Sequence, residues 1–437
     1  MTGMPDGHDT RRTGQGPAPL IACEMCAAVF HREPLQPGEA ACCTRCGNHL
    51  WRYSRLPLNA WLALALTALI VFLVANAYPI ASMSVQGMVR LASLPDALVV
   101  TWQQGDRAVA LMCGLAAFAL PLLQILLLLW ILPPLCRQRV APGFALALRL
   151  LALLRPWSMV PVFLLGVLVA VVKLAGMASV SPGAGLAAFA ALTVLLTMLG
   201  RLSPDAICRL AEETGALPVH VPPRRTNSVL AGCHVCGQVH TLEPHLAEPG
   251  VTCMRCRAGV HRRKPDHVAR TWALLVAAWI LYIPANALPI MHIQALTGSS
   301  AHTILGGSIQ LWEMGSWDLA LVVFIASVVV PMTKLLALMG LLVTLQRRSP
   351  RNLQQRTRLY QAVEFIGQWS MLDVFVVILL SALARFQGLM QIDAGDGAVA
   401  FGLVVVLTML AALSFDPRHS WDAAALRNPD PGPVAGT

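Results

Sequence analysis

The sequence predicts an α-helical polytopic membrane protein with two tandem repeats, each a cytoplasmic zinc ribbon followed by four transmembrane helices. Hydrophobic residues make up 56% of the 437 residues and charged residues only 12%. Soluble domains carry about 25% charged residues. The apolar residues also cluster in runs of about 18 to 28, long enough to cross a hydrocarbon core about 30 Å thick. This composition excludes a disordered protein and disfavours a soluble enzyme.

Eight membrane spans are predicted from the apolar runs. They cover residues 58–78, 107–132, 157–175, 184–200, 269–288, 318–344, 366–386 and 397–413. The predicted domains are a disordered arm (1–20), zinc ribbon 1 (21–56), transmembrane repeat 1 (57–205), a cytoplasmic linker (206–230), zinc ribbon 2 (231–266), transmembrane repeat 2 (267–416) and a disordered tail (417–437). The arm is polar and lacks an apolar core, so no cleavable signal peptide is expected.

The distribution of basic residues predicts the orientation of these spans. Of the 32 Lys and Arg residues, 26 lie in the termini, the middle section and two loops of the same side. The connections on the opposite side contain only Arg90. Because short loops rich in Lys and Arg stay in the cytoplasm, both termini and both cysteine-rich modules are expected there. The net charge of +10 therefore indicates topology, not nucleic-acid binding.

An internal duplication relates the two halves of the sequence. Four cysteines recur at an offset of 210 residues: Cys23, Cys26, Cys43 and Cys46 match Cys233, Cys236, Cys253 and Cys256. The same offset relates the motif Asn-Ala-x-Pro-Ile at 76–80 to its copy at 286–290, and Pro121 to Pro331. Each repeat contains an even number of spans, so both halves should share one orientation, related by a pseudo-two-fold axis along the membrane normal.

Each cysteine-rich module has the pattern C-x2-C-x16-C-x2-C, which is typical of structural zinc sites. Four thiolates supply the tetrahedral ligand set that zinc prefers, and so small a module has no other means of forming a core. We therefore expect two structural zinc ions; iron, a thiol redox switch and disulfides are the alternatives. Gly47 and Gly237 fit tight turns, because glycine tolerates a positive φ. The other cysteines are expected to be bystanders: Cys42, Cys113, Cys136 and Cys208.

Ionisable residues inside the spans indicate a polar site in the second repeat, because charges in hydrocarbon are costly and are usually functional or paired. Lys334 and Asp373 are expected at similar depths, compatible with an ion pair. Ser370 shares the helix face of Asp373. Thr408 and, nearer the cytoplasmic mouth, Glu364 extend the cluster. A transport role is weighed against a structural pair that only fixes helix packing.

The first repeat lacks this charged centre. It has uncharged residues at the positions that correspond to Lys334, Asp373, Thr408 and Glu364, namely Gln124, Pro161, Thr197 and Ala152. The Asn-Ala-x-Pro-Ile motifs end a span in both repeats, where proline stops or kinks a helix and asparagine satisfies freed backbone groups. On the outer side, amphipathic segments around Trp102 and Trp312 are expected to form helices at the headgroup level.

The sequence resembles the paraquat-inducible protein A (PqiA/LetA) family over about residues 20 to 420. The resemblance rests on the duplicated four-cysteine module, the four spans after each copy, Asn-Ala-x-Pro-Ile, Trp-Ser-Met-Leu-Asp at 369–373 and Ser-Phe-Asp-Pro-Arg at 414–418. It implies a protein of the bacterial inner membrane that is not an enzyme. It also implies an MCE-domain partner that spans the periplasm, phospholipid transport between inner and outer membranes that maintains envelope integrity, and a central polar site at Lys334, Asp373 and Thr408.

Two other functions stay open at this point. The chain can be a structural anchor that holds a periplasmic MCE tunnel on the membrane without transport of its own. It can also be a metal- or redox-sensing membrane protein, which would require a labile metal or reactive thiols.

Overall fold

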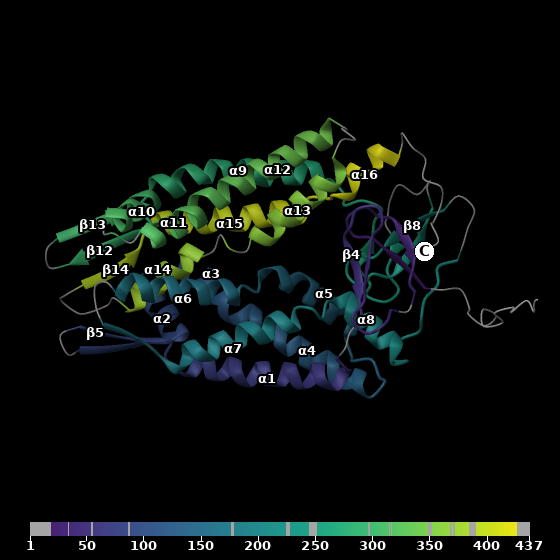
Figure 1. Cartoon of the computed structure of the whole chain (residues 1–437), viewed down its shortest axis with the longest axis horizontal. Helices are drawn as coiled ribbons and strands as arrows, with labels where there is room; N and C mark the ends of the chain where they lie inside the picture. The colour runs from purple at the N-terminus through teal and green to yellow at the C-terminus, as the bar shows by residue number, and fades with distance from the viewer. Residues whose placement is uncertain are drawn as a thin grey trace, which may run out of the picture.

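The apolar runs of both halves form long helices that lie in two adjacent groups (Figure 1). The computed structural model describes residues 19–425 apart from residues 34, 54–55, 86–87, 176–178, 224–227, 244–250, 296–297, 314, 316, 348–351, 368, 370–371 and 384–389. In hydrocarbon the backbone N–H and C=O groups must bond within their own segment, which is why Leu-, Val- and Ala-rich runs are helical.

The helices follow the same order in both halves. The first half contains α1 (Leu58–Ala77), α2 (Leu94–Gln103), α3 (Arg107–Cys113), α4 (Leu120–Cys136), α5 (Phe144–Leu154), α6 (Val160–Ala175), α7 (Ala184–Leu199) and α8 (Pro204–Glu213). The second half contains α9 (His267–Ala287), α10 (Ile304–Glu313), α11 (Trp317–Phe324), α12 (Val330–Gln346), α13 (Leu353–Gly367), α14 (Leu372–Leu383), α15 (Asp396–Ser414) and α16 (Arg418–Ala425).

Six helical segments among the described residues are long and apolar enough to cross a membrane. They cover Leu58–Ala77, Arg107–Cys136, Phe144–Val171, His267–Ala287, Ala320–Gln346 and Asp396–Asp422. A seventh candidate is the pair α7 and α8, which is bent by 61°. The chain is therefore a multi-pass membrane protein. Eight spans stay a prediction, because α14 has 12 residues and residues 384–389 beyond it lie outside the described part of the chain.

One candidate span, Phe144–Val171, begins in a segment that was expected to be a loop, 133–155. Within it α5 buries Phe144, Leu148 and Leu151 at helical spacing and leaves Arg149 exposed. The loop expectation rested on the basic residues of this segment. An amphipathic helix accommodates such residues on its outer face, so the charge count did not reveal it.

The two helix groups contact each other through α6 and α14. α1 packs against α4 and α7, whereas α9 packs against α15 and α12. α6 and α14 lie between these groups (Figure 1). Phe163 of α6 meets the ring of Phe375 of α14 edge-on, with ring centroids 5.5 Å apart. Both rings are almost fully buried, so the interface between the halves is a continuous apolar core.

A π-helical turn interrupts the second span of each half. These turns are η1 (Gly114–Ala119) before α4 and η3 (Ile325–Val329) before α12. Each is followed by the proline of the sequence repeat, Pro121 or Pro331, in the first turn of the next helix. Proline has no N–H to donate to the preceding turn, which favours a local change of helical pitch. The sequence analysis identified the prolines but not the π-turns.

Two three-stranded antiparallel sheets lie at the end of the molecule away from the ribbons (Figure 1). The first contains β5 (Ala81–Val85), β6 (Met88–Ala92) and β7 (Ser179–Pro182), with β5 in the centre. The second contains β12 (Met291–Ala295), β13 (Gly298–His302) and β14 (Met390–Ala394), with β12 in the centre. These sheets were not predicted from the sequence. The two expected amphipathic segments are helical, as α2 and α10, and Trp102 and Trp312 within them are 50% and 62% exposed; their place at the headgroup level stays a prediction.

The cysteine-rich modules are small β-structures, as predicted. The first has two antiparallel hairpins, β1 (Leu20–Ala22) with β2 (Val29–His31) and β3 (Ala40–Cys42) with β4 (His49–Arg52). The second pairs β8 (Val229–Gly232) with β9 (Val239–Leu242) and β10 (Val251–Thr252) with β11 (Gly259–Val260). We call these modules ribbon 1 and ribbon 2.

Two helices lie where no regular structure was expected. α8 extends into the predicted linker 206–230, and α16 occupies the start of the predicted disordered tail 417–437. α8 begins with the N-cap Ser203, whose hydroxyl accepts a hydrogen bond from the N–H of Ala206. α16 is ordered by Trp421, which is buried against ribbon 1. The tail prediction was therefore wrong for residues 418–425, because their partner is distant in sequence.

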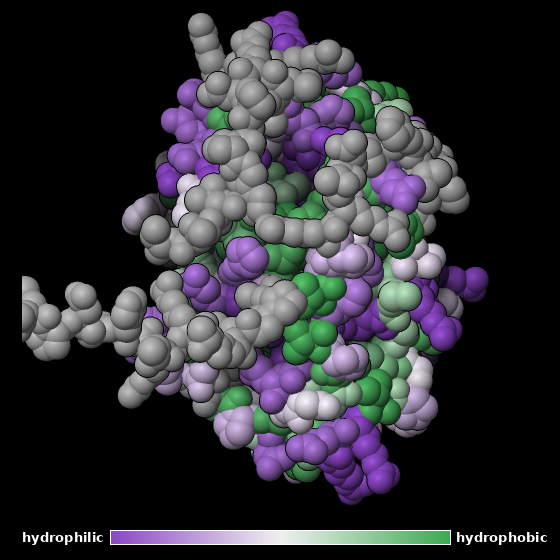
Figure 2. All heavy atoms as spheres, turned by 90° about the vertical axis from the view of Figure 1, so that its right-hand side faces the viewer, coloured by the Kyte–Doolittle hydropathy of each residue, from purple (hydrophilic) through white to green (hydrophobic). Residues whose placement is uncertain are grey.

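The cysteine cluster of ribbon 1 packs on the second half of the chain, and the cysteine cluster of ribbon 2 packs on the first. In ribbon 1, the carbonyl of Glu24 accepts a hydrogen bond from Arg418 Nε at 2.8 Å, and Asn48 accepts one from Gln361 at 2.8 Å. In ribbon 2, Arg255 pairs with Glu212 of α8 at 2.6 Å. The ribbons also touch each other and form one polar end of the molecule, where hydrophilic residues surround smaller apolar patches (Figure 2).

Candidate functional site: two cysteine clusters and a buried lysine

Ribbon 1 brings its four predicted ligands together. Cys23 and Cys46 have their Sγ atoms 3.5 Å apart, as do Cys26 and Cys43. All four Sγ atoms lie within 4.8 Å of one another, and all four residues are buried. Tetrahedral zinc with Zn–S bonds of about 2.3 Å requires S···S separations of about 3.8 Å. The cluster can therefore hold a metal ion with four sulfur ligands.

Ribbon 2 repeats this geometry and adds a donor. Sγ atoms are 3.4 Å apart for Cys233 and Cys256 and 3.5 Å apart for Cys236 and Cys253. The ring Nε2 of His240 lies 3.3 Å from Cys253 Sγ. An N–H directed at a ligating sulfur orients it and balances its negative charge. Ribbon 1 has Phe30 at the corresponding position, so the two clusters have different surroundings.

Each pair of ligands lies on a tight turn with one residue in the left-handed region. These residues are Ala27 (φ 59°), Gly47 (φ 77°), Gly237 (φ 70°) and Arg257 (φ 57°), each four positions after the first cysteine of its pair. In all four turns the N–H of this residue donates to the carbonyl of that cysteine at 2.8–3.0 Å. The prediction for Gly47 and Gly237 is confirmed. Ala27 and Arg257 adopt the same conformation at a steric cost.

The remaining cysteines are not part of a metal cluster. Cys113 and Cys208 are buried, Cys136 is half-buried, and Cys42 is exposed. All twelve cysteines are free, so the structure contains no disulfide. Burial raises the pKa of Cys208 to about 12, which keeps this thiol protonated.

Glu212 of α8 joins the two ribbons. Its Oε2 pairs with Arg32 of ribbon 1 at 2.6 Å, and its Oε1 pairs with Arg255 of ribbon 2 at 2.6 Å. The side chains of Glu212 and Arg255 are only 8% and 9% exposed. On the same helix, burial opposes ionisation of Asp205, but its ion pair with Arg209 prevails and lowers the pKa of the Asp205 carboxyl. Sequence reasoning missed this linkage because the partners are far apart in the chain.

Lys334 of α12 is a buried basic residue of the second half. Its side chain is 2% exposed, and its Nζ has no hydrogen-bond partner among the described residues. It lies against the last residue of α13: a Cβ added to Gly367 would be 2.9 Å from Nζ. A lysine in this position is costly unless it has a partner or a function.

A cavity of about 340 Å³ borders Lys334. Its wall combines α12, α13, α15 and the short helix η2 (Arg155–Trp157) of the first half. Glu364 lines the cavity. The surrounding protein partly desolvates its carboxyl, which raises the pKa of that group. Lys334 and Glu364, predicted as members of one polar cluster, therefore line one cavity.

Three other predicted residues are placed less completely. Thr408 of α15 is 2% exposed and donates to the carbonyl of Val405 at 2.9 Å, one turn before Ala412 in the cavity wall. Asp373 belongs to α14, but its side chain lies outside the described residues, as does the whole of Ser370. The ion pair between Lys334 and Asp373 thus stays a prediction.

The corresponding first-half residues have different surroundings. Gln124 is also buried, 5% exposed, and its Oε1 has no partner among the described residues. Thr197, by contrast, is exposed and donates to the carbonyl of Thr193 at 2.7 Å. A buried polar position is therefore shared by the two halves, whereas a charge at that position is found only in the second.

The two Asn-Ala-x-Pro-Ile motifs form matching structural joints. Asn76 Nδ2 donates to the carbonyl of Phe72, and Asn286 Nδ2 donates to the carbonyl of Tyr282, both at 2.8 Å. The carbonyl of each motif's isoleucine accepts a hydrogen bond at 2.9 Å from a glycine N–H, that of Gly183 or Gly395. These contacts use the motif for helix packing, as the structural interpretation of the sequence expected.

Comparison with known proteins identifies relatives over nearly the whole chain. The family model described as Paraquat-inducible protein A matches residues 58–210 and 268–425. Intermembrane transport protein PqiA of Escherichia coli is 33% identical over 412 residues, 92% of this chain and 95% of that protein. Lipophilic envelope-spanning tunnel protein A of Escherichia coli is 30% identical over 412 residues, 92% of this chain and 91% of that protein. A probable intermembrane transport protein of Haemophilus influenzae is 28% identical over 409 residues, 93% of this chain and 96% of that protein.

These matches confirm the family resemblance seen in the sequence. The relatives are named as transport and tunnel proteins and not as enzymes, which agrees with the expectation that the chain is not an enzyme. No solved structure matches the chain.

Proposed function

This chain belongs to the paraquat-inducible protein A family, and from this premise we propose that it moves phospholipids between the inner and outer membranes of a bacterium. In this proposal it is the inner-membrane component of an MCE-type system, with a periplasm-spanning MCE-domain protein as its partner. The names of its relatives, which describe intermembrane transport and an envelope-spanning tunnel, support this function.

The proposed topology has eight spans in two tandem repeats, with both termini and both ribbons in the cytoplasm. The excess of basic residues at the ribbon end supports this orientation. Each ribbon would hold one zinc ion through its four cysteines, since four thiolates in this geometry favour zinc and leave no position open for a substrate. The metal would stabilise the ribbon fold and take no part in transport.

The observation that carries the proposal is Lys334, a buried ammonium beside a cavity between the two halves. A cation in an apolar surrounding requires an anion or a proton exchange. In the proposed mechanism Lys334 is paired in turn with Asp373 of α14 and with the phosphate of a passing lipid. Glu364 lines both this cavity and a second one of about 590 Å³ between the helices and the ribbons.

The test replaces Lys334 by Gln and, separately, Asp373 by Asn, and measures phospholipid transfer and envelope integrity at equal protein levels. Transfer should fall at least tenfold in both variants, because the counter-ion exchange is lost. Gln124→Ala in the first half is the matched control and should keep transfer. Unchanged transfer in Lys334→Gln would remove the charged site from the mechanism.

A structural anchor for a periplasmic tunnel is the second candidate. The exposed indoles of Trp102 and Trp312, at the end of the molecule away from the ribbons, favour a docking role there. An anchor without transport predicts that Trp312→Ala abolishes function while Lys334→Gln has no effect. The third candidate, metal or redox sensing, is disfavoured by burial, because all eight ligating cysteines are 4% exposed or less.

A further inference from the structure

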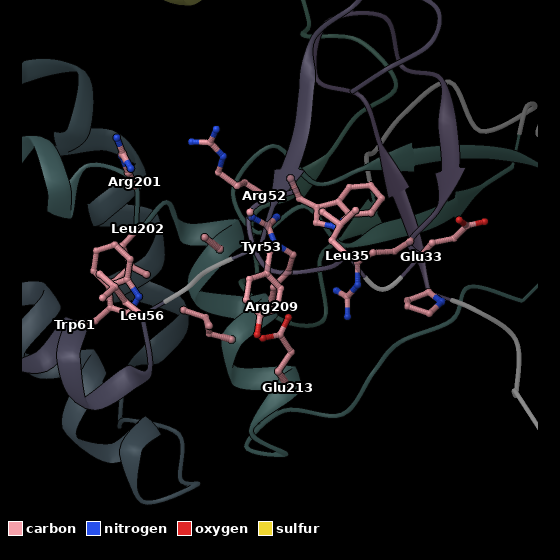
Figure 3. Close-up of a pocket in the computed structure, with 16 residues that line it drawn as sticks. Glu33, Leu35, Arg52, Tyr53, Leu56, Trp61, Arg201, Leu202, Arg209 and Glu213 are labelled. Atoms are coloured by element: carbon pink, nitrogen blue, oxygen red, sulfur yellow. The ribbon is translucent and has the colours of Figure 1, made fainter. Parts of the chain in front are cut away.

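Another cavity, separate from the one at Lys334, lies between ribbon 1 and the first-half helices (Figure 3). Its volume is about 680 Å³, within the range of small-ligand sites. Ribbon 1 contributes Trp51 and Arg52 of β4 and residues of the segments that follow β2 and β4. The helical part contributes the start of α1, the connection between α7 and α8, and one face of α8.

One part of the cavity lining is apolar. Leu56, Trp61 and Leu202 lie together there, at the ends of α1 and α7 (Figure 3). Trp61 belongs to the first turn of the membrane helix α1, and the side chain of Leu56 is 42% exposed. This is the depth at which a membrane helix leaves the hydrocarbon core, and tryptophan is enriched at that level.

The rest of the lining is rich in arginine: Arg32 and Arg52 come from ribbon 1, and Arg201 and Arg209 come from the helical part. Four arginines line the cavity, against two acids, Glu33 and Glu213. Two of the arginines are already engaged: Arg32 pairs with Glu212, and Arg209 pairs with Asp205. Arg52 and Arg201 are exposed and make no ion pair or side-chain hydrogen bond with a described residue. Arg52 extends from β4 toward the helix ends where Arg201 lies (Figure 3).

We infer that this cavity binds the phosphate-bearing headgroup of an anionic phospholipid from the membrane leaflet on the ribbon side. Arg52 and Arg201 would hold the phosphate through charge-assisted hydrogen bonds, with Tyr53 beside them. The apolar residues at the helix ends would receive the beginning of the acyl chains. An ordinary soluble anion needs no apolar side, and an apolar partner needs no unpaired arginines, so the combination specifies a lipid.

This site lies at ribbon 1 and the helices of the first half, whereas the proposed transport site lies at Lys334 of the second half. It gives the first half a lipid contact of its own at the membrane surface, where it would fix ribbon 1 against the leaflet. The inference needs only that the chain lies in a membrane with its ribbons at one surface. It therefore stands or falls independently of phospholipid transfer through Lys334.

The experiment uses the full chain in nanodiscs with equal amounts of phosphatidylglycerol and phosphatidylcholine. Native mass spectrometry counts the lipids of each kind that stay bound after release from the disc. Wild type should retain phosphatidylglycerol preferentially, and the Arg52→Gln, Arg201→Gln double variant should lose this preference by roughly tenfold. The matched control removes two exposed arginines outside the cavity, Arg137→Gln and Arg139→Gln, and should keep it.

Two further measurements complete the test. Zinc content of the double variant should equal that of wild type, which shows that ribbon 1 is still folded. Millimolar glycerol phosphate should not displace the lipid, because it lacks acyl chains. Equal phosphatidylglycerol retention in the double variant, an equal loss in the control, or displacement by glycerol phosphate would each overturn the inference.

Discussion

The two halves of the molecule have the same joints but different interiors. Both halves place a π-turn before the proline of the second span, and both fasten an Asn-Ala-x-Pro-Ile motif to a glycine-led helix. Yet the buried position held by Gln124 in the first half is Lys334 in the second. Thr197 is exposed where Thr408 is 2% exposed.

This difference shows which features the fold requires and which it merely permits. A buried threonine bonds to its own helix, as Thr408 does, and a neutral glutamine costs less to bury than a charge, so both are compatible with either half. A buried lysine has no such local solution, which is why the proposed function places the transport site at Lys334. The first half, in turn, has the arginine-lined cavity at the membrane surface. The following experiments test whether the two halves differ only where this comparison says they do.

The largest effect is expected from loss of a metal ligand. Cys43→Ser in ribbon 1 and Cys253→Ser in ribbon 2 should each reduce zinc from two ions to one per chain and unfold that ribbon, since structural zinc contributes about 10 kcal/mol or more to such folds. Elemental analysis and limited proteolysis measure both. Cys42→Ser should retain both ions. Because each ribbon packs on the opposite half, Cys43→Ser should expose the region around Trp421, and Cys253→Ser the region around α8. Cleavage limited to the same half would contradict the crossed packing.

The glycine joints should respond alike in both halves. A Cβ on Gly183 would lie 2.2 Å from the carbonyl oxygen of Pro79, and one on Gly395 would lie 2.3 Å from that of Pro289. Alanine at either position must displace backbone, so each variant should lose about 3 kcal/mol in thermal unfolding in detergent. Gly340→Ala, with no atom within 4 Å of the new Cβ, is the control and should be neutral or stabilising. A much smaller loss in one half would show that the joints are not equivalent.

The bridge between the ribbons should contribute less. Glu212→Gln leaves Arg32 and Arg255 without their shared counter-ion. The free energy of unfolding should fall by about 2 kcal/mol, because the pair with Arg255 is buried whereas the pair with Arg32 is partly exposed. The neighbouring Glu213→Gln is exposed and should cost nothing measurable. Differential scanning fluorimetry with hydrogen exchange on both ribbons is the readout. Protection lost in only one ribbon would mean that Glu212 supports that ribbon and does not join the two.

The smallest effects concern the ribbon turns. Ala27→Gly should stabilise ribbon 1 by about 1 kcal/mol, because alanine at φ 59° is strained and glycine is not. Gly47→Ala should cost about the same, since its new Cβ would meet nothing within 4 Å and only the φ of 77° is unfavourable. Competition with a zinc chelator measures both variants. If Ala27→Gly and Gly47→Ala changed the stability of ribbon 1 in the same direction, side-chain contacts and not backbone conformation would control these turns.

Much of the site could be predicted because its signals are local. The cysteine pattern identified all eight cysteines of the two clusters that can hold a metal ion, and Gly47 and Gly237 were assigned to their turns from the sequence. The burial of Lys334 followed from its place in an apolar run. The features that were missed depend on distant partners. Trp421 of α16 is buried against ribbon 1, which is distant in the sequence. The central strands β5 and β12 each pair with a strand about 100 residues later, and a local sequence pattern does not reveal such a pairing.

The crossed packing of the ribbons also sets an order in time. The carbonyl of Glu24 is bonded by Arg418, 394 residues later in the chain. At about 5–20 residues per second, ribbon 1 emerges from the ribosome roughly 20–80 s before the helix that covers it. The contacts between ribbon 1 and Arg418 therefore form only when synthesis is nearly complete. In a chain truncated before Arg418, this surface of ribbon 1 stays exposed. The covered surface of ribbon 1 is therefore a structural feature of the complete chain alone.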